Sequence, residues 1–226
     1  MEKNASNGYY PVALKMAGKR CLVAGGGKVA ERKLMGLLEA GADRVVLISP
    51  AVTEAIQKLS DIGAIEWLPR ACSVKSDLSG AWLVIAATND RELNAAIAEE
   101  AERLGILSNI ADDYERGSFI TPSVIRKGRL LISVTATGAS PVFAKAVSRE
   151  LESRYGQRYA DALERLNELR RLAQEKIEDR MLKEKVLRLA ADECLTMKHS
   201  MGHAEDWLHR LIDRTKGGLQ DEQQQQ

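Results

Sequence analysis

The stretch Cys21-Leu22-Val23-Ala24-Gly25-Gly26-Gly27-Lys28-Val29-Ala30 decides the fold of this chain. Four apolar residues, typical of a buried strand, lead directly into three glycines, and residues 28–40 then follow a helical pattern that stops at Gly41. At such a strand-to-helix junction, the spacing Gly25-x-Gly27-x-x-Ala30 indicates a dinucleotide-binding turn. Glycine lets the backbone approach a pyrophosphate, a small third residue lets the helix pack closely on the strand, and the helix presents unpaired N–H groups to phosphate.

The alternation of strand and helix continues to about residue 112. Further strands are expected over 44–49, 64–68, 81–87 and 106–110, with helices over 51–59 and 90–104 between them. Strands that alternate with helices of this length indicate βαβ units, so the expected fold class is α/β with a Rossmann-type parallel sheet. The fully apolar strand over 81–87 is expected inside the sheet.

The pattern changes after residue 112. Two strand-like runs over 119–125 and 130–135, separated by residues 126–129, predict a β-hairpin. Ser140 and Pro141 are a cap residue and a first-turn proline, and everything from about residue 142 to 216 reads as helix. The polar tail at 221–226 is expected to be disordered.

Composition excludes several classes of protein. The 226 residues include 33 Lys+Arg and 32 Asp+Glu, a net charge of +1, which excludes a domain that is basic as a whole and binds nucleic acid by counterion release. The three cysteines form no C-x-x-C pair, which favours reduced thiols over a disulfide framework or a zinc knuckle. The first residues lack an apolar signal region, and no apolar stretch reaches the roughly 20 residues of a membrane helix. A cytoplasmic protein without membrane or nucleic-acid partners is expected.

Ligands of open parallel sheets bind beyond the carboxyl ends of the strands. Those ends carry Gly25–Gly27, Ser49-Pro50, Thr88-Asn89 and the segment from Asn109 to Asp113. The second strand ends in Ser49-Pro50, where dinucleotide-binding domains usually have an acid for the ribose, so these residues leave the choice between NAD and NADP open. Asp112 or Asp113 could accept a proton while a hydride leaves, although adjacent aspartates more often cap helices or face solvent in turns.

Several ordered motifs resemble one family. They are Tyr10-Pro11, the stretch from Cys21 to Lys33, Ile85-Ala86-Ala87-Thr88-Asn89-Asp90, Asn109-Ile110-Ala111-Asp112, Phe119-Ile120-Thr121-Pro122 and Thr137-Gly138-Ala139-Ser140-Pro141. Over roughly residues 9–155 the chain resembles the precorrin-2 dehydrogenases of sirohaem synthesis, some of which also insert iron into sirohydrochlorin.

The resemblance implies an NAD-dependent oxidation of precorrin-2, a porphyrinoid with many carboxylate groups, to sirohydrochlorin. It implies a homodimer with an NAD-binding Rossmann domain over 1–113, a dimerisation region over 114–141 and a helical domain over 142–226. The essential aspartate of the family falls on Asp112. The implied cofactor contacts are Gly25, Gly26, Gly27, Lys28, Val29, Ser49, Pro50 and Thr88, and no metal ligand is assigned. The absence of a ribose acid is a feature of this family too.

Two other functions remain open from the sequence. The site that oxidises precorrin-2 could also insert iron into sirohydrochlorin, which would make the protein bifunctional. A Rossmann fold could instead serve a non-enzymatic module that senses NAD, because fold alone does not fix function.

Two groups of charged side chains could have a function or could simply be exposed to solvent. His199, His203 and His209 have a spacing that can hold a metal, but Gly202 interrupts the helix, which favours surface histidines. A basic group could steer a polyanionic substrate or simply face water; its members are Arg126, Lys127, Arg129, Lys145 and Arg149.

Overall fold

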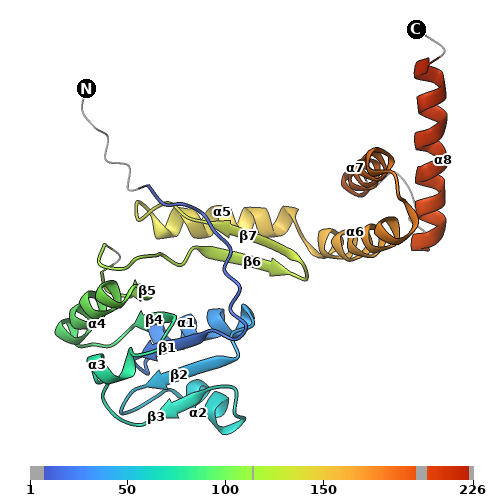
Figure 1. Ribbon diagram of the computed structural model, residues 1–226. Helices are drawn as coiled ribbons and strands as arrows, with labels where there is room; N and C mark the ends of the chain where they lie inside the picture. The colour runs from blue at the N-terminus through green and yellow to red at the C-terminus, as the bar shows by residue number, and fades with distance from the viewer. Residues whose placement is uncertain (1–7, 114, 197–202, 224–226) are drawn as a thin grey trace. The chain divides into compact units, whose positions relative to one another are not determined.

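The computed structural model describes residues 8–113, 115–196 and 203–223 (Figure 1). The chain forms two compact units, which divide between Thr121 and Pro122. Within the described residues, no helix combines the length and the apolar character needed to span a bilayer.

A five-stranded sheet forms the centre of the first unit, in the order β3-β2-β1-β4-β5 (Figure 1). All four neighbouring pairs are parallel, which confirms the α/β, Rossmann-type class. The strands are β1 (Arg20–Ala24), β2 (Arg44–Ile48), β3 (Glu66–Leu68), β4 (Leu83–Ala86) and β5 (Leu107–Ile110). The helices are α1 (Lys28–Glu39), α2 (Glu54–Asp61), α3 (Val74–Asp77) and α4 (Arg91–Leu104). The apolar strand β4 lies inside the sheet as expected, between β1 and β5.

The register of the sheet aligns the ends of its strands. Ala24 at the end of β1 pairs with Ile48 of β2 on one side and with Ala86 of β4 on the other, and Ala86 pairs with Ile110 of β5. The loops that leave these four residues therefore start from the same edge of the sheet, which we call the carboxyl edge.

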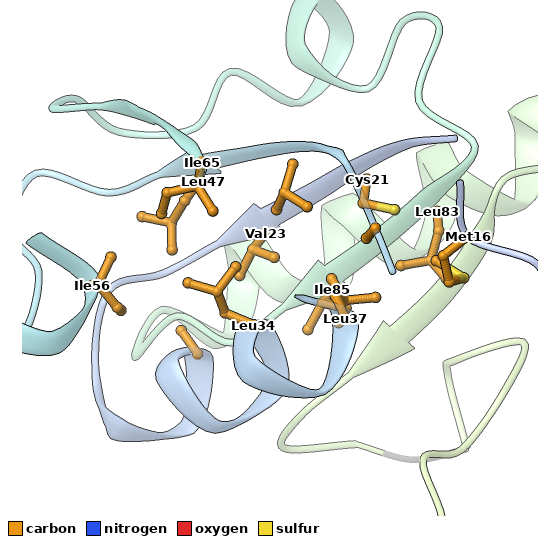
Figure 2. Close-up of a cluster of buried hydrophobic side chains, with 13 residues drawn as sticks. Met16, Cys21, Val23, Leu34, Leu37, Leu47, Ile56, Ile65, Leu83 and Ile85 are labelled. Atoms are coloured by element: carbon orange, nitrogen blue, oxygen red, sulfur yellow. The ribbon is translucent and has the colours of Figure 1, made fainter. Parts of the chain in front are cut away.

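Both faces of the sheet are buried. On one face, Leu34 and Leu37 of α1 point toward Val23 and Ile85, and Ile56 of α2 closes the same cluster (Figure 2). On the other face, the core lies beneath α3 and α4; its members include Leu22, Ala24, Val84, Leu78, Ile97 and Ala101. Burial on both sides explains why β1, β2 and β4 are nearly continuous apolar runs in the sequence rather than alternating ones.

Two boundaries in the first unit differ from expectation. Helix α2 starts at Glu54 and not at residue 51, because Thr53 is extended: its N–H donates to the carbonyl of Gly26 at 3.1 Å, and its Oγ1 accepts from the N–H of Ile56 at 3.4 Å. The short helix α3 was not anticipated, since four residues are too few to show a helical period.

The second unit begins with an antiparallel hairpin of β6 (Ser123–Lys127) and β7 (Leu130–Val134). The expected strand start at 119 is wrong, because the N–H of Phe119 donates to the carbonyl of Ser108 at 3.2 Å and so lies along β5. Helix α5 (Pro141–Arg154) packs against the hairpin. The Oγ of Ser140 accepts from the N–H of Phe143 at 3.2 Å, which confirms the predicted cap.

Three further helices pack together around a second apolar core: α6 (Gln157–Lys176), α7 (Arg180–Thr196) and α8 (Ala204–Gln223). The core includes Leu169, Ala173, Val186, Ala190, Trp207 and Leu211. The expected helical character of residues 142–216 is divided among separate helices, because the backbone is extended at Gly156 and at Ile177. These breaks allow α5, α6 and α7 to change direction.

A buried carboxylate links α7 to α8. Glu193 is 8% exposed and accepts hydrogen bonds from the indole N–H of Trp207 at 2.8 Å and from the guanidinium of Arg214 at 2.9 Å. Arg210 donates to the same carboxylate at 3.2 Å. We therefore expect Glu193→Ala to lower the free energy of unfolding of the helical unit by about 2 kcal/mol, because hydrogen bonds to a charged group are lost and a buried N–H loses this acceptor.

Urea denaturation followed by tryptophan fluorescence measures this effect. Glu184→Ala is the matched control, since Glu184 is exposed and pairs only along its own helix with Arg180, at 3.0 Å. Its expected cost is below about 0.5 kcal/mol. Equal stability of the two variants would contradict a structural role for the Glu193 cluster.

Candidate functional site

The first two glycines of the turn pack against neighbouring loops. Gly25 has φ +114°, which only glycine adopts readily, and its N–H donates to the carbonyl of Ile48 at 2.9 Å. A Cβ on Gly25 would lie 2.3 Å from the carbonyl oxygen of Ala87, and one on Gly26 would lie 2.0 Å from that of Ala51. Both glycines are therefore needed to bring three strand-end loops into contact.

The third glycine has a different role. Gly27 has φ −83° and ψ −175°, which any residue adopts, and a Cβ there would have no heavy atom within 4 Å. Gly27 is also the N-cap of α1, yet no side chain caps the first N–H groups of that helix. The open space above Gly27 and the N–H groups of the first turn together form a cradle in which a phosphate group could lie.

Lys28 and Val29 follow on the first turn of α1, and both are exposed. The ammonium of Lys28 lies 3.0 Å from the carboxylate of Glu31 on the same helix. Hydrogen bonds from Thr53 and then from Lys28 lower the pKa of Glu31. Ala30 is fully buried, as the close packing of α1 on β1 requires.

Ser49 and Pro50 lie at the end of β2, beside the glycine turn. The hydroxyl of Ser49 donates to the carbonyl of Ala51 at 2.7 Å, and the backbone carbonyl of Ser49 accepts from the indole of Trp67 at 2.9 Å. Ser49 is buried, whereas Pro50 is exposed. Because Ser49 is the donor in its bond to Ala51, the lone pairs of its hydroxyl oxygen can still accept a hydrogen bond from a ribose hydroxyl.

A hydrogen-bond network joins the ends of β4 and β5. The hydroxyl of Thr88 lies 2.8 Å from Oδ1 of Asn94, and Nδ2 of Asn94 donates to Oδ1 of Asp112 at 2.9 Å. Asn94 lies on the first turn of α4 and is 1% exposed. The network thus connects a predicted cofactor contact to the predicted catalytic aspartate.

The structure distinguishes the two adjacent aspartates. Oδ1 of Asp113 accepts from the N–H of Glu115 and its Oδ2 accepts from Arg116 Nε, both at 3.1 Å. Asp113 therefore stabilises its own turn. Asp112, whose side chain is 33% exposed, lies beside Asn94 and has Arg91 Nε 4.0 Å from its other oxygen.

Asn109 is a second buried amide near this edge, 4% exposed. Its Nδ2 donates to the carbonyl of Phe119 at 3.0 Å. Its Oδ1 has no hydrogen-bond partner among the residues that the structure describes. Asn109 belongs to β5 and precedes Asp112 by three residues, so an acceptor atom lies buried close to the carboxyl edge.

The predicted site residues form one continuous row along the carboxyl edge. Ser49 lies against Gly26, Gly25 lies against the loop after β4, and Thr88 reaches Asp112 through Asn94. Sequence reasoning missed Asn94. The available signal was a polar side chain at the start of the buried stripe of α4, which continues with Ile97, Ala98 and Ala101.

The cysteines take no part in this row. Burial, with Asp77 as a smaller cause, raises the pKa of the Cys72 thiol to about 11, and burial also raises the pKa of Cys21 and of Cys194. A thiol with a raised pKa is a poor nucleophile at neutral pH.

The other charged candidates belong to the second unit of the chain. His199 lies outside the described residues, while His203 and His209 are exposed. Within residues 8–113, 115–196 and 203–223, no group of three His, Cys, Asp or Glu side chains is arranged to hold a metal ion. In the basic group, Lys127 pairs with Glu152 at 3.1 Å and Arg129 with Glu164 at 2.9 Å.

The order of the strands is that of a dinucleotide-binding domain of the Rossmann type. The glycine turn and the open cradle at Gly27 are typical of the same class. Comparison with known proteins agrees: a family model described as "Putative NAD(P)-binding" matches residues 12–123. The open cradle at Gly27 has room for the pyrophosphate of an NAD(P) cofactor.

Several curated proteins are similar to this chain in sequence. The chain is 40% identical over 145 residues to "Siroheme synthase 1" of Aeromonas salmonicida, which covers 64% of this chain and 31% of that protein. It is 37% identical over 165 residues to "Siroheme synthase" of Chromobacterium violaceum, covering 69% and 35%. The chain thus spans about a third of the length of these relatives.

A solved structure extends the similarity beyond the first unit. "SirC, precorrin-2 dehydrogenase" matches with a TM-score of 0.74 at 25% identity, over 91% of this chain and 100% of that one. The chain is thus similar in sequence to sirohaem synthases and in fold to a precorrin-2 dehydrogenase.

Proposed function

We propose that this protein is an NAD-dependent precorrin-2 dehydrogenase, which oxidises precorrin-2 to sirohydrochlorin. The name of the matched solved structure supports the substrate, and the names of the curated relatives support the pathway. The single observation that carries the proposal is the row of residues along the carboxyl edge, in which Asp112 is linked to the dinucleotide-binding loops through Asn94 and Thr88.

In the proposed reaction precorrin-2 loses a hydride, which carries both of the electrons removed, and a proton. NAD⁺, when bound, supplies the hydride acceptor. Asp112 accepts the proton through its carboxylate and releases it to solvent, to which the side chain is 33% exposed. Gly25, Gly26 and Gly27 with the first turn of α1, Lys28 and Val29, hold the pyrophosphate, while Ser49, Pro50 and Thr88 line the rest of the cofactor site.

The test is anaerobic addition of precorrin-2 to the protein and NAD⁺, with NADH followed by absorbance. We expect NADH to form in step with sirohydrochlorin. NADPH formation from NADP⁺ under the same conditions measures the cofactor preference. A protein that binds NADH but makes none from precorrin-2 would instead be an NAD-sensing module.

We also propose a homodimer in which a second copy covers the exposed face of the β6–β7 hairpin. Val124 and Leu131 are 49% and 45% exposed, and they lie on the face opposite the buried Ile125. Light scattering during gel filtration tests this, with a mass twice that of the chain expected. Val124→Asp together with Leu131→Asp is expected to yield the monomer.

For the location of the reaction we propose the cytoplasm. None of the three cysteines forms a disulfide, as is usual in a reducing compartment.

A further inference from the structure

We propose that Asn94 is the positioning residue that orients the Asp112 carboxylate for proton transfer. The inference rests on the proposed function, since it concerns how the proposed base is held. The observation behind it is the 2.9 Å hydrogen bond from Nδ2 of Asn94 to Oδ1 of Asp112.

Every hydrogen-bonding group of the Asn94 amide is occupied. Its Nδ2 donates to Asp112 and, at 3.1 Å, to the backbone carbonyl of Thr88. Its Oδ1 accepts from the backbone N–H of Thr88 at 3.3 Å and lies 2.8 Å from the Thr88 hydroxyl. These partners fix which side of the amide carries nitrogen, because only the NH₂ group can donate to a carboxylate.

The proposed base, Asp112, is less constrained by its backbone than Asn94 is. Asp112 follows β5 in a bend and belongs to no helix or strand, so the backbone does not fix its side chain. Asn94, in contrast, is on α4, whose start is capped by Asp90 through a 3.0 Å bond to the N–H of Leu93. A rigid helix therefore holds the carboxylate through one amide.

The hydrogen bond also assigns separate roles to the two oxygens of Asp112. Oδ1 is held by Asn94, whereas Oδ2 has Arg91 Nε at 4.0 Å, which is too far for a hydrogen bond. Oδ2 is thus the oxygen that accepts the proton from the substrate. The side chain of Arg91 is 91% exposed and does not block access to it.

A double-mutant cycle between Asn94→Ala and Asp112→Asn tests the inference in the full chain. In the otherwise unchanged protein, Asn94→Ala is expected to lower kcat with precorrin-2 by about 10- to 100-fold, since a misplaced catalytic group loses rate of this order. In the Asp112→Asn background, the same change should lower the residual rate by less than about twofold, because there is no base left to orient.

Two further measurements separate positioning from a structural role. The Kd for NADH, from fluorescence titration, should change by less than about threefold in Asn94→Ala, because Thr88 keeps its contacts with the backbone of Asp90. Glu102→Ala, on the exposed end of the same helix, is the matched control and should leave both kcat and Kd unchanged.

Equal losses of rate in both backgrounds, or full activity of Asn94→Ala, would overturn the inference while leaving the proposed function intact. A tenfold weaker NADH affinity would also overturn it, since Asn94 would then act through the cofactor site. An unmodified chain that makes no NADH would overturn the proposed function itself, and the inference with it.

Discussion

Asp112→Asn is expected to lower dehydrogenase turnover by about 10²- to 10⁴-fold, the usual contribution of a positioned general base. The substitution keeps the size of the side chain and an oxygen that can accept from Nδ2 of Asn94, so the local structure should persist. Only the negative charge and the ability to take a proton are removed. Steady-state NADH formation with saturating NAD⁺ measures the effect, and the affinity for NADH should remain that of the unmodified protein.

The neighbouring carboxylate provides the matched control for this substitution. Asp113→Asn removes one charge from the adjacent position, where the carboxylate pairs with Arg116 and caps a turn. It should retain most of the turnover and lose some stability of the loop. If Asp113→Asn proved the more damaging change, the assignment of the base to Asp112 would be wrong.

Gly27→Ala is expected to weaken NADH binding by at least about tenfold without destabilising the fold. The backbone of Gly27 suits any residue and the added methyl group meets no protein atom, so folding should be unaffected. The methyl group would, however, occupy the cradle above the first turn of α1 and hold the pyrophosphate away from the N–H groups. Fluorescence titration with NADH and thermal unfolding of the free protein measure the two quantities.

The neighbouring glycine should give the opposite result. Gly26→Ala would place its Cβ 2.0 Å from the carbonyl oxygen of Ala51, a backbone atom that cannot move without disrupting the β2–α2 loop. We expect this variant to lose at least about 3 kcal/mol of stability, as severe overpacking does. Gly36→Ala, in open space on α1, controls for the change of residue type. Normal NADH affinity in Gly27→Ala would contradict the location of the phosphate cradle.

The fold of the first unit could be predicted because its signals are local. The signals are a buried strand, a glycine turn and a helix with a small residue at position 30, all within a few residues of one another. Each can be recognised from the sequence without knowledge of distant contacts. The positions of the candidate site followed from a general property of parallel sheets, since ligands bind where the strands end. The aligned register of Ala24, Ala86 and Ile110 brings those ends together as expected.

Other features depend on contacts between residues far apart in the chain. The start of α2 shifts because the N–H of Thr53 bonds to Gly26, and the bond from Asn94 to Asp112 joins positions 18 residues apart. In the helical unit, the backbone is extended at Gly156 and at Ile177, and the positions of these two breaks were not predicted. Gly26 and Gly27 are adjacent glycines that the sequence alone cannot distinguish. In the structure a neighbouring loop packs on Gly26, whereas the space next to Gly27 is open, so the first has a packing role and the second a predicted binding role.

The most direct test of the central claim is a single-turnover experiment without oxygen, in which excess protein and NAD⁺ meet a known amount of precorrin-2. We expect one NADH and one sirohydrochlorin for each precorrin-2 consumed, and a strongly slowed reaction in Asp112→Asn. An unmodified protein that binds NADH but leaves precorrin-2 unchanged, or an equally fast reaction in Asp112→Asn, would contradict it.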